Sequence, residues 1–239
     1  MSQSEHPWYE TAWSQAAYEQ FIPEWESVEK RTADIVRMCR LRQGMRILDV
    51  ACGSGAETSA LALMGYDVTA LDFSSAMLDV ARRIAREKTA RVDWRCGDMR
   101  RLDEQGKYDL VMVRDVIFGI FDHETNLDVL TRLGNAVKKG GCLLLEVYNK
   151  DVAVEKKVVE GFLSYNPALN RFEGTFEKPV DEQFVKEFAS CEFFSVQEWP
   201  NILSGLQFRE VSFYPSDSAR LKGLGYTQSL VIDVVGFKE

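Results

Sequence analysis

The sequence predicts an α/β protein built on a parallel sheet with helices on both faces. Three observations support this class. From residue 46, short continuous apolar runs alternate with amphipathic helical segments. A glycine turn, "ACGSG", follows the first apolar run, and an acidic residue lies in or just after each of the first three runs. The 239 residues suit one domain with embellishments, because a single core can grow to roughly 250 residues.

The chain opens with a segment rich in aromatic residues. Residues 8–40 predict two helices, "YETAWSQAAYEQFIPEW" and "ESVEKRTADIVRMCR", with Pro23 between them or in the first turn of the second. Residues 1–40 are expected to cover the sheet edge as a helical lid or to pack on the sheet by their aromatic face.

The alternation then follows in order. A strand "RILDVA" leads to a helix "ETSALALMG", and a strand "YDVTALD" leads to a helix "SSAMLDVARRIAREK" capped by Ser74 or Ser75. The third and fourth strands lie in "ARVDWRCGD" and "YDLVMVRD". The next helix is "HETNLDVLTRLGNAVKKGG", expected to end at Gly140 and Gly141, before a fifth strand "CLLLEVYN".

Residues 150–195 interrupt this order. They predict a helix "DVAVEKKVVEGFL" and two antiparallel strands, "RFEGTFEKPV" and "EQFVKEFASCEFFS". The segment is too short for a core of its own, so we expect an insertion over the ligand edge of the sheet. Alternate phenylalanines should face the sheet, and the others should roof a substrate pocket or form a dimer surface. The phenylalanines of this segment are Phe172, Phe176, Phe184, Phe188, Phe193 and Phe194. A short helix in "VQEWPNILSGLQF" and the strands "REVSFYP" and "QSLVIDVVGFK" close the chain.

Composition narrows the function. The net charge of −8 and the short, mixed basic clusters argue against a nucleic-acid partner. No apolar run has membrane-spanning length and no secretory signal is visible, which predicts a cytoplasmic protein with no membrane partner. The two histidines and five scattered cysteines predict no metal site and reduced, buried thiols: Cys39, Cys52, Cys96, Cys142 and Cys191.

Three acids follow successive strands. Asp49 lies in the first strand, Asp72 ends the second and Asp98 follows the third. Ligands of open α/β sheets bind beyond the carboxyl ends of the strands, where a carboxylate after the second strand can accept both ribose hydroxyls. Asp72 as a helix cap and Asp98 as a turn residue are the structural alternatives. Together with the glycine turn, the three acids favour an adenosine lying across three strands.

The glycine turn differs from a dinucleotide-binding turn. Gly53 and Gly55 are followed by Thr58 where the dinucleotide fingerprint has its third glycine, and Asp49 precedes the loop where a pyrophosphate would meet its charge. A ligand with an ammonium group fits better. A nicotinamide-dependent dehydrogenase is therefore disfavoured.

Five ordered motifs carry a family resemblance. "ILDVACGSGAET", "ALDFSSAML", "GDMRRL", "YDLVMVRDVIFGI" and "AVKKGGCLLLEVYN" resemble the successive motifs of the class I S-adenosylmethionine-dependent methyltransferases over about residues 45–150. The resemblance implies a Rossmann-like sheet of seven strands, mostly parallel with an antiparallel last strand, and a single methyltransferase domain over residues 1–239. It implies S-adenosyl-L-methionine as cofactor and S-adenosyl-L-homocysteine as product.

The resemblance also implies roles for individual residues. Asp49 and the carbonyl near Ala51 surround the amino group of the methionine part, Asp72 binds the ribose and Asp98 meets the adenine amino group. The other cofactor-binding residues that it implies are Gly53, Gly55, Phe73, Met77, Met99 and Arg114, with Tyr9 and Tyr18 from the lid. A tyrosine near the sulfonium is physically sensible because aromatic faces attract cations. Arg114 has an alternative role as a surface ion-pair partner.

The acceptor is less defined. The fourth strand ends in "VRDV", without the Asn/Asp-Pro-Pro-aromatic motif of enzymes that methylate nucleobase or glutamine amines, and no metal is implied. We expect methyl transfer to an oxygen or nitrogen of a small organic molecule. A peptide or protein amine acceptor, or a non-catalytic module that binds the cofactor, are the alternatives, and a homodimer is compatible with the insertion.

Proton removal from the acceptor needs a general base if the acceptor is a hydroxyl or an ammonium. Asp115, His123 and Tyr148 are the candidates, with Glu146 a weaker one, because all lie after the fourth or fifth strand. His123 as a solvated helix-start residue and Tyr148 as a pocket wall are the structural alternatives.

Overall fold

The computed structural model describes residues 22–159, 161, 163–180, 183–216 and 222–239. The expectations for the first helix, Tyr9 and Tyr18 lie outside these residues. Within them, no helix is both long and apolar enough to cross a membrane.

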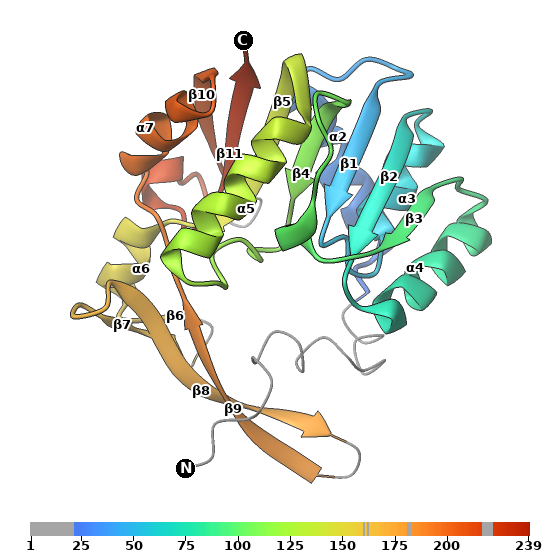
Figure 1. The fold of residues 1–239 in the computed structure, drawn as a ribbon. Helices are drawn as coiled ribbons and strands as arrows, with labels where there is room; N and C mark the ends of the chain where they lie inside the picture. Colours follow the sequence, from blue (N-terminus) through green and yellow to red (C-terminus); the bar gives the residue numbers. More distant parts are fainter. Residues whose placement is uncertain (1–21, 160, 162, 181–182, 217–221) are drawn as a thin grey trace.

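The main sheet has seven strands in the order β10-β11-β5-β4-β1-β2-β3 (Figure 1). Only β11 runs against its neighbours β5 and β10, so the predicted mostly parallel sheet with an antiparallel last strand is confirmed. The bounds are β1 Arg46–Val50, β2 Asp67–Asp72, β3 Asp93–Cys96, β4 Tyr108–Val113, β5 Val137–Tyr148, β10 Phe208–Pro215 and β11 Val231–Lys238.

Helices cover both faces, because successive strand residues point to opposite sides of the sheet. Ile47 of β1 packs with helix α2, and the next residue, Leu48, packs in the core that includes helix α5. The first face carries α2 Trp25–Met38, α3 Ala56–Leu63 and α4 Ser75–Lys88; the second carries α5 His123–Ala136 and α7 Glu198–Gly205. Ser74 caps α4 by accepting the N–H of Met77.

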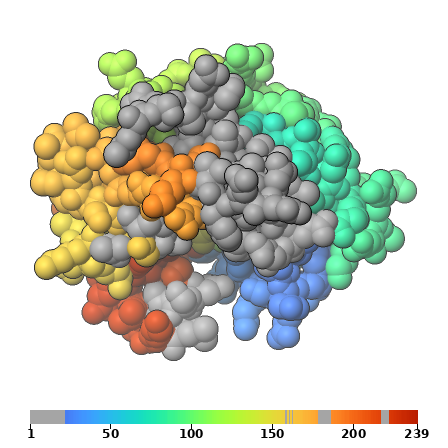
Figure 2. Space-filling view, turned by 90° about the horizontal axis from the view of Figure 1, so that it is seen from below, coloured from blue at the N-terminus to red at the C-terminus, as the bar shows by residue number. Residues whose placement is uncertain are grey.

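A second sheet of four antiparallel strands, β6-β7-β8-β9, lies below the carboxyl ends of the parallel strands (Figure 1). Its strands are β6 Val158–Val159, β7 Leu163–Asn166, β8 Arg171–Val180 and β9 Gln183–Cys191, and helix α6 Lys150–Lys156 precedes them. Seen from below, the insertion occupies one side of this face and the region around α4 the other (Figure 2).

Two predicted helices were too long. The helix expected over "DVAVEKKVVEGFL" ends at Lys156, and the β-branched pair Val158 and Val159 pairs with β7 instead. The helix from His123 ends at Ala136, since Val137 already pairs with Tyr108 of β4 in an irregular start of β5. Short 3₁₀ turns, η2 Met99–Arg101 and η3 Tyr226–Gln228, complete the described elements.

The cysteine expectation was correct for three of the five residues. Cys39, Cys142 and Cys191 are buried, whereas Cys52 is half-buried and Cys96 is exposed. Cys52 belongs to the glycine loop and Cys96 to the edge strand β3, where one side of the strand has no neighbour in the sheet.

Candidate functional site

A cavity of about 420 Å³ lies at the carboxyl edge of the main sheet. It is formed by the residues that follow strands β1, β2, β3 and β4. The residues that line it are Val50, Ala51, Gly53, Ser54, Leu71, Asp72, Phe73, Met77, Gly97, Asp98, Met99, Arg100, Asp115, Ile117, Ile120 and Phe121. Seven of the predicted cofactor-binding residues are among them: Ala51, Gly53, Asp72, Phe73, Met77, Asp98 and Met99.

Strand register brings these residues together. Val50 of β1 pairs with Leu71 of β2 on one side and with Val113 of β4 on the other. The glycine loop that follows Val50 is therefore flanked by Asp72 from β2 and by Asp115, which follows β4.

The backbone of the glycine loop lies in the left-handed region at three positions: Ala51, Gly53 and Gly55 have φ of 58°, 52° and 65°. A Cβ on Gly55 would lie 2.5 Å from the Trp94 ring and 2.8 Å from Ala81. Gly55 thus permits the close packing of the loop onto its surroundings. A Cβ on Gly53 would meet only Met77, at 3.8 Å, and both residues line the cavity.

Asp72 is buried beside the loop. Its carboxylate accepts the N–H groups of Gly53 and Ser74, each at 2.9 Å. Burial raises the pKa of Asp72, and these backbone hydrogen bonds oppose that rise. Each carboxylate oxygen has a further lone pair for a ligand hydroxyl.

Asp98 is held by its own neighbour. It accepts the backbone N–H of Arg100 at 2.8 Å and the Arg100 guanidinium at 2.8 and 2.5 Å. Burial raises the pKa of Asp98, but the hydrogen bonds from Arg100 outweigh burial and the net direction is downward. The carboxylate therefore stays ionised as an acceptor at the β3 end of the cavity.

Asp49 lies beneath the loop and is not among the residues that line the cavity. Its buried carboxyl group accepts the hydroxyl hydrogen of Thr58. Burial raises the pKa of Asp49 to about 8, and the Thr58 hydrogen bond opposes that rise. Thr58, at the place of the third dinucleotide glycine, thus serves as the hydrogen-bond partner of Asp49.

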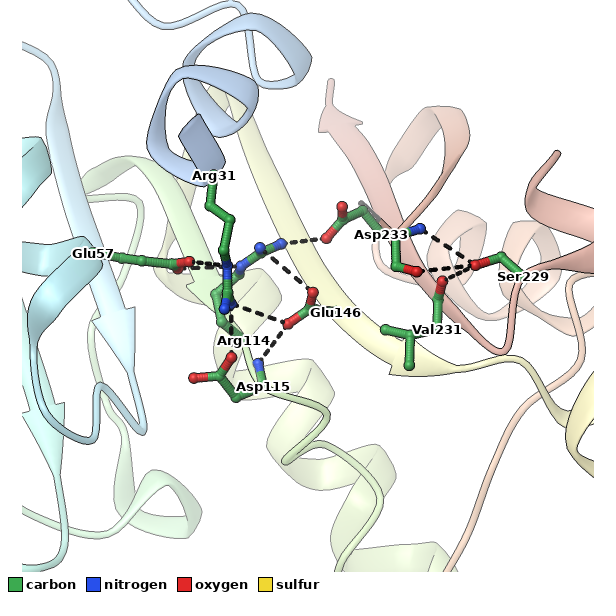
Figure 3. Close-up of polar contacts among 9 residues, drawn as sticks. Arg31, Glu57, Arg114, Asp115, Glu146, Ser229, Val231 and Asp233 are labelled. Carbon is green, nitrogen blue, oxygen red and sulfur yellow. Dashed lines mark hydrogen bonds and ion pairs between the residues drawn. The ribbon is translucent and has the colours of Figure 1, made fainter. Parts of the chain in front are cut away.

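Arg114 is not among the residues that line the cavity, and its side chain lies in a buried cluster of charges (Figure 3). Its guanidinium pairs with Glu57 at 3.3 Å, with Glu146 at 3.5 Å and with Asp233 of β11. Burial lowers the pKa of Arg114, but the three carboxylates reverse the direction and raise it. Arg114 is an ion-pair partner, as the alternative expected, but these pairs are buried and do not lie on the surface.

Arg31 of α2 belongs to the same cluster (Figure 3). It pairs with Glu57 at 2.6 Å, Asp115 at 2.7 Å and Glu146 at 3.6 Å. Asp115 is the member of the cluster that lines the cavity, and its side chain is 76% exposed.

The turn after β4 has an unusual backbone. Asp115 and Val116 have φ of 57° and 53°, a conformation that costs energy for residues other than glycine. Glu146 holds this turn by accepting the N–H of Asp115 at 2.8 Å.

His123 lines a second cavity, of about 490 Å³, that shares Arg100, Ile120 and Phe121 with the first. Its Nδ1 is 2.7 Å from an oxygen of Glu192, whose other oxygen accepts the amide of Asn126 at 2.9 Å. These contacts tie the end of the insertion to the start of α5.

Tyr148 is buried at the end of β5. Its ring stacks on Phe193 with 4.5 Å between centroids, and Phe193 stacks on Phe172 at 4.2 Å. Tyr148 is not among the residues that line either cavity. Of the six insertion phenylalanines, Phe172, Phe193 and Phe194 are buried, Phe176 is half-buried, Phe188 is 58% exposed, and the side chain of Phe184 lies outside the described part.

Sequence reasoning missed Arg31, Glu57, Asn126, Glu192 and Asp233. Each acts through a partner far away in the chain, so spacing gave no signal for it. Their segments contain many other charged or polar residues, so nothing in the sequence distinguished these five.

Residues 47–141 match the model of a protein family described as "Methyltransferase domain". A ubiquinone biosynthesis O-methyltransferase from Azorhizobium caulinodans is 32% identical over 118 residues, covering 48% of this chain and 45% of the relative. The same-named protein of Xanthomonas campestris is 31% identical over 120 residues, covering 49% of each. The chain thus spans about half the length of the curated relatives it matches.

Solved structures are similar over nearly the whole chain. The CcbJ methyltransferase from Streptomyces caelestis has a TM-score of 0.73 at 14% identity and covers 95% of this chain and 97% of its own. The S-adenosylmethionine-bound CalS10 from Micromonospora echinaspora, an amino pentose methyltransferase, has a TM-score of 0.61 at 17% identity and covers 100% of both chains. At such identities the likeness shows the fold.

Proposed function

We propose that this chain, which carries a methyltransferase domain over residues 47–141, transfers the methyl group of S-adenosyl-L-methionine to an oxygen or nitrogen of a small organic molecule. The observation that supports this most is the cavity at the sheet edge, where Asp72 and Asp98 meet beside the glycine loop. The names of the curated relatives favour an oxygen acceptor.

The residues present fit an adenosine joined to an amino acid. Asp98 and Asp72 lie at the ends of adjacent strands, as an adenine amine and a ribose diol require. A side chain at Gly53 would project toward Met77 inside the cavity, and glycine leaves that space to a ligand. A pyrophosphate would instead lie near Asp72 and Asp115, both carboxylates.

When bound, the cofactor supplies a methyl group on a sulfonium, which is a good leaving group. The protein then has to align the acceptor and exclude water, and alignment alone can contribute roughly 7–11 kcal/mol. Asp115 is the proton-acceptor candidate that lines the cofactor cavity; His123 faces the neighbouring cavity. We propose the acceptor to be a small molecule, with no nucleic-acid or membrane partner, in the cytoplasm; a homodimer is compatible with the proposal.

Calorimetric titration of the protein with S-adenosylmethionine, S-adenosylhomocysteine and NADH tests this function. We expect the first two to bind and NADH to give no heat. Binding of NADH alone would contradict the proposal. Transfer of a labelled methyl group to a panel of hydroxylated and amino-bearing small molecules then distinguishes turnover from binding.

A further inference from the structure

The charges around the cofactor cavity are unequal. Arg31 and Arg114 together face four carboxyl groups, those of Glu57, Asp115, Glu146 and Asp233 (Figure 3). Arg31 shares its single positive charge among three of them. Burial raises the pKa of Glu57, and that of Asp233 to about 7, so these two groups hold protons more readily than an ordinary carboxyl group. Asp115 is the acidic side chain of the cluster that lines the cavity.

Asp115 presents its carboxyl group to the cavity. Its Oδ1 pairs with Arg31, and no hydrogen bond joins its Oδ2 to another residue in the described part of the chain. The Asp115 backbone is fixed in the left-handed region by the hydrogen bond to Glu146. Within the described residues, Arg31 thus holds one oxygen of the Asp115 carboxylate, and the other oxygen has no hydrogen bond.

Strand order decides which part of a ligand lies nearest Asp115. Asp98 follows β3, Asp72 ends β2, the glycine loop follows β1 and Asp115 follows β4, in the spatial order of the strands. An adenosine that spans β3 and β2 places its 5′ substituent over the loop, between Asp72 and Asp115. In the proposed cofactor, the 5′ substituent is the sulfur.

We propose that Asp115 recognises the positive charge on this sulfur, so that the cavity binds the charged methyl donor in preference to its neutral product. This inference rests on the proposed function and assigns Asp115 a role in specificity rather than in proton removal. Because product differs from donor at sulfur by one methyl group and one charge, the preference favours exchange of product for fresh donor after each transfer.

Calorimetry on the wild type and the Asp115→Asn variant tests the inference without an acceptor. The probes are S-adenosylmethionine, S-adenosylhomocysteine and sinefungin, which carries an amine cation near the sulfonium position. We expect the variant to lose roughly tenfold in affinity for the two cations and less than about twofold for S-adenosylhomocysteine. A tenfold loss corresponds to a charge-pair energy between the values for bulk water and for a protein surface. Asparagine tolerates the left-handed backbone, so the turn should be preserved.

Asp79→Asn is the matched control. Asp79 is 78% exposed and pairs with an arginine, Arg82, at 3.0 Å, but it lies on α4 and does not line the cavity. It should change none of the three affinities. Equal loss of all three ligands in Asp115→Asn, or no loss, would overturn the role of Asp115 while leaving the function intact. A wild type that binds neither donor nor product would overturn both.

Discussion

The edge of the main sheet and the insertion differ in the contacts that bring their residues together. At the sheet edge, short loops after β1, β2 and β3 bring Gly53, Asp72 and Asp98 together through strand register alone. The insertion instead depends on contacts between distant segments, such as Glu192 with His123 and Asn126. The first region follows local sequence signals and forms the cavity proposed for the cofactor, whereas the second is specified by tertiary contacts. Changes in the first should affect ligand binding or the loop beneath it, and changes in the second should affect stability alone.

The largest effect should come from Asp49→Asn, measured as unfolding free energy against pH. Burial raises the pKa of Asp49 from its usual value to about 8, so the folded state holds a proton that the unfolded state releases above about pH 4. Wild-type stability should therefore fall as pH rises toward 8, by roughly 1 kcal/mol per pH unit from this group. Asparagine keeps an acceptor for Thr58 and removes this slope. Parallel pH profiles for the two proteins would show that Asp49 is already ionised.

Gly55→Ala should destabilise the protein by about 3 kcal/mol, because its Cβ would meet Trp94 and Ala81 at a left-handed φ. Denaturant unfolding measures this. Gly106→Ala is the control: its φ is also positive, at 54°, but nothing lies within 4 Å of its Cβ, so only the backbone cost of about 1 kcal/mol should appear. Equal losses would mean that packing around Gly55 adjusts freely.

Asp72→Ala should weaken S-adenosylmethionine binding roughly 100-fold, or about 2.7 kcal/mol, since it removes the acceptor for the ribose and the anchor of Gly53. Asp67→Ala, at the exposed start of the same strand, should leave the affinity unchanged. Calorimetric titration compares them. An unaltered affinity in Asp72→Ala would show that the ribose does not bind at Asp72.

Asn126→Ala should destabilise the protein by about 2 kcal/mol and leave cofactor affinity as it is. Asn126 is fully buried, bonds the backbone of Phe121 at 3.0 and 3.1 Å, and bonds Glu192. Asn201→Ala, on the exposed face of α7, should cost little. If Asn126→Ala lowers cofactor affinity instead, the two regions are coupled through Phe121, which Asn126 holds and which lines the cavity.

The same contrast explains what the sequence could predict. The strand–loop–helix rhythm and the acids Asp72 and Asp98 are local signals, and the structure brings those acids together at one cavity. The length of the helix after Asn149 was wrong because pairing with β7 overrides its helical pattern. Arg31 reaches Asp115 across 84 positions and Arg114 reaches Asp233 across 119, separations at which no pattern in the sequence identifies a partner.

The stacked rings of Tyr148, Phe193 and Phe172 determine whether the insertion can be removed from the rest of the protein. These rings and Ala189 and Cys191 belong to the same hydrophobic cluster as the strands of the main sheet. Gly119 also leaves no room for a side chain, because its Cβ position overlaps the Glu192 carbonyl oxygen. The segment between Asn149 and Phe194 therefore shares its core with the main sheet and is not an independent unit. Its excision would uncover the Tyr148 ring and the Gly119 carbonyl oxygen, which accepts the Glu192 N–H at 2.7 Å. A transplanted insertion would therefore have to bring the residues that contact these two groups.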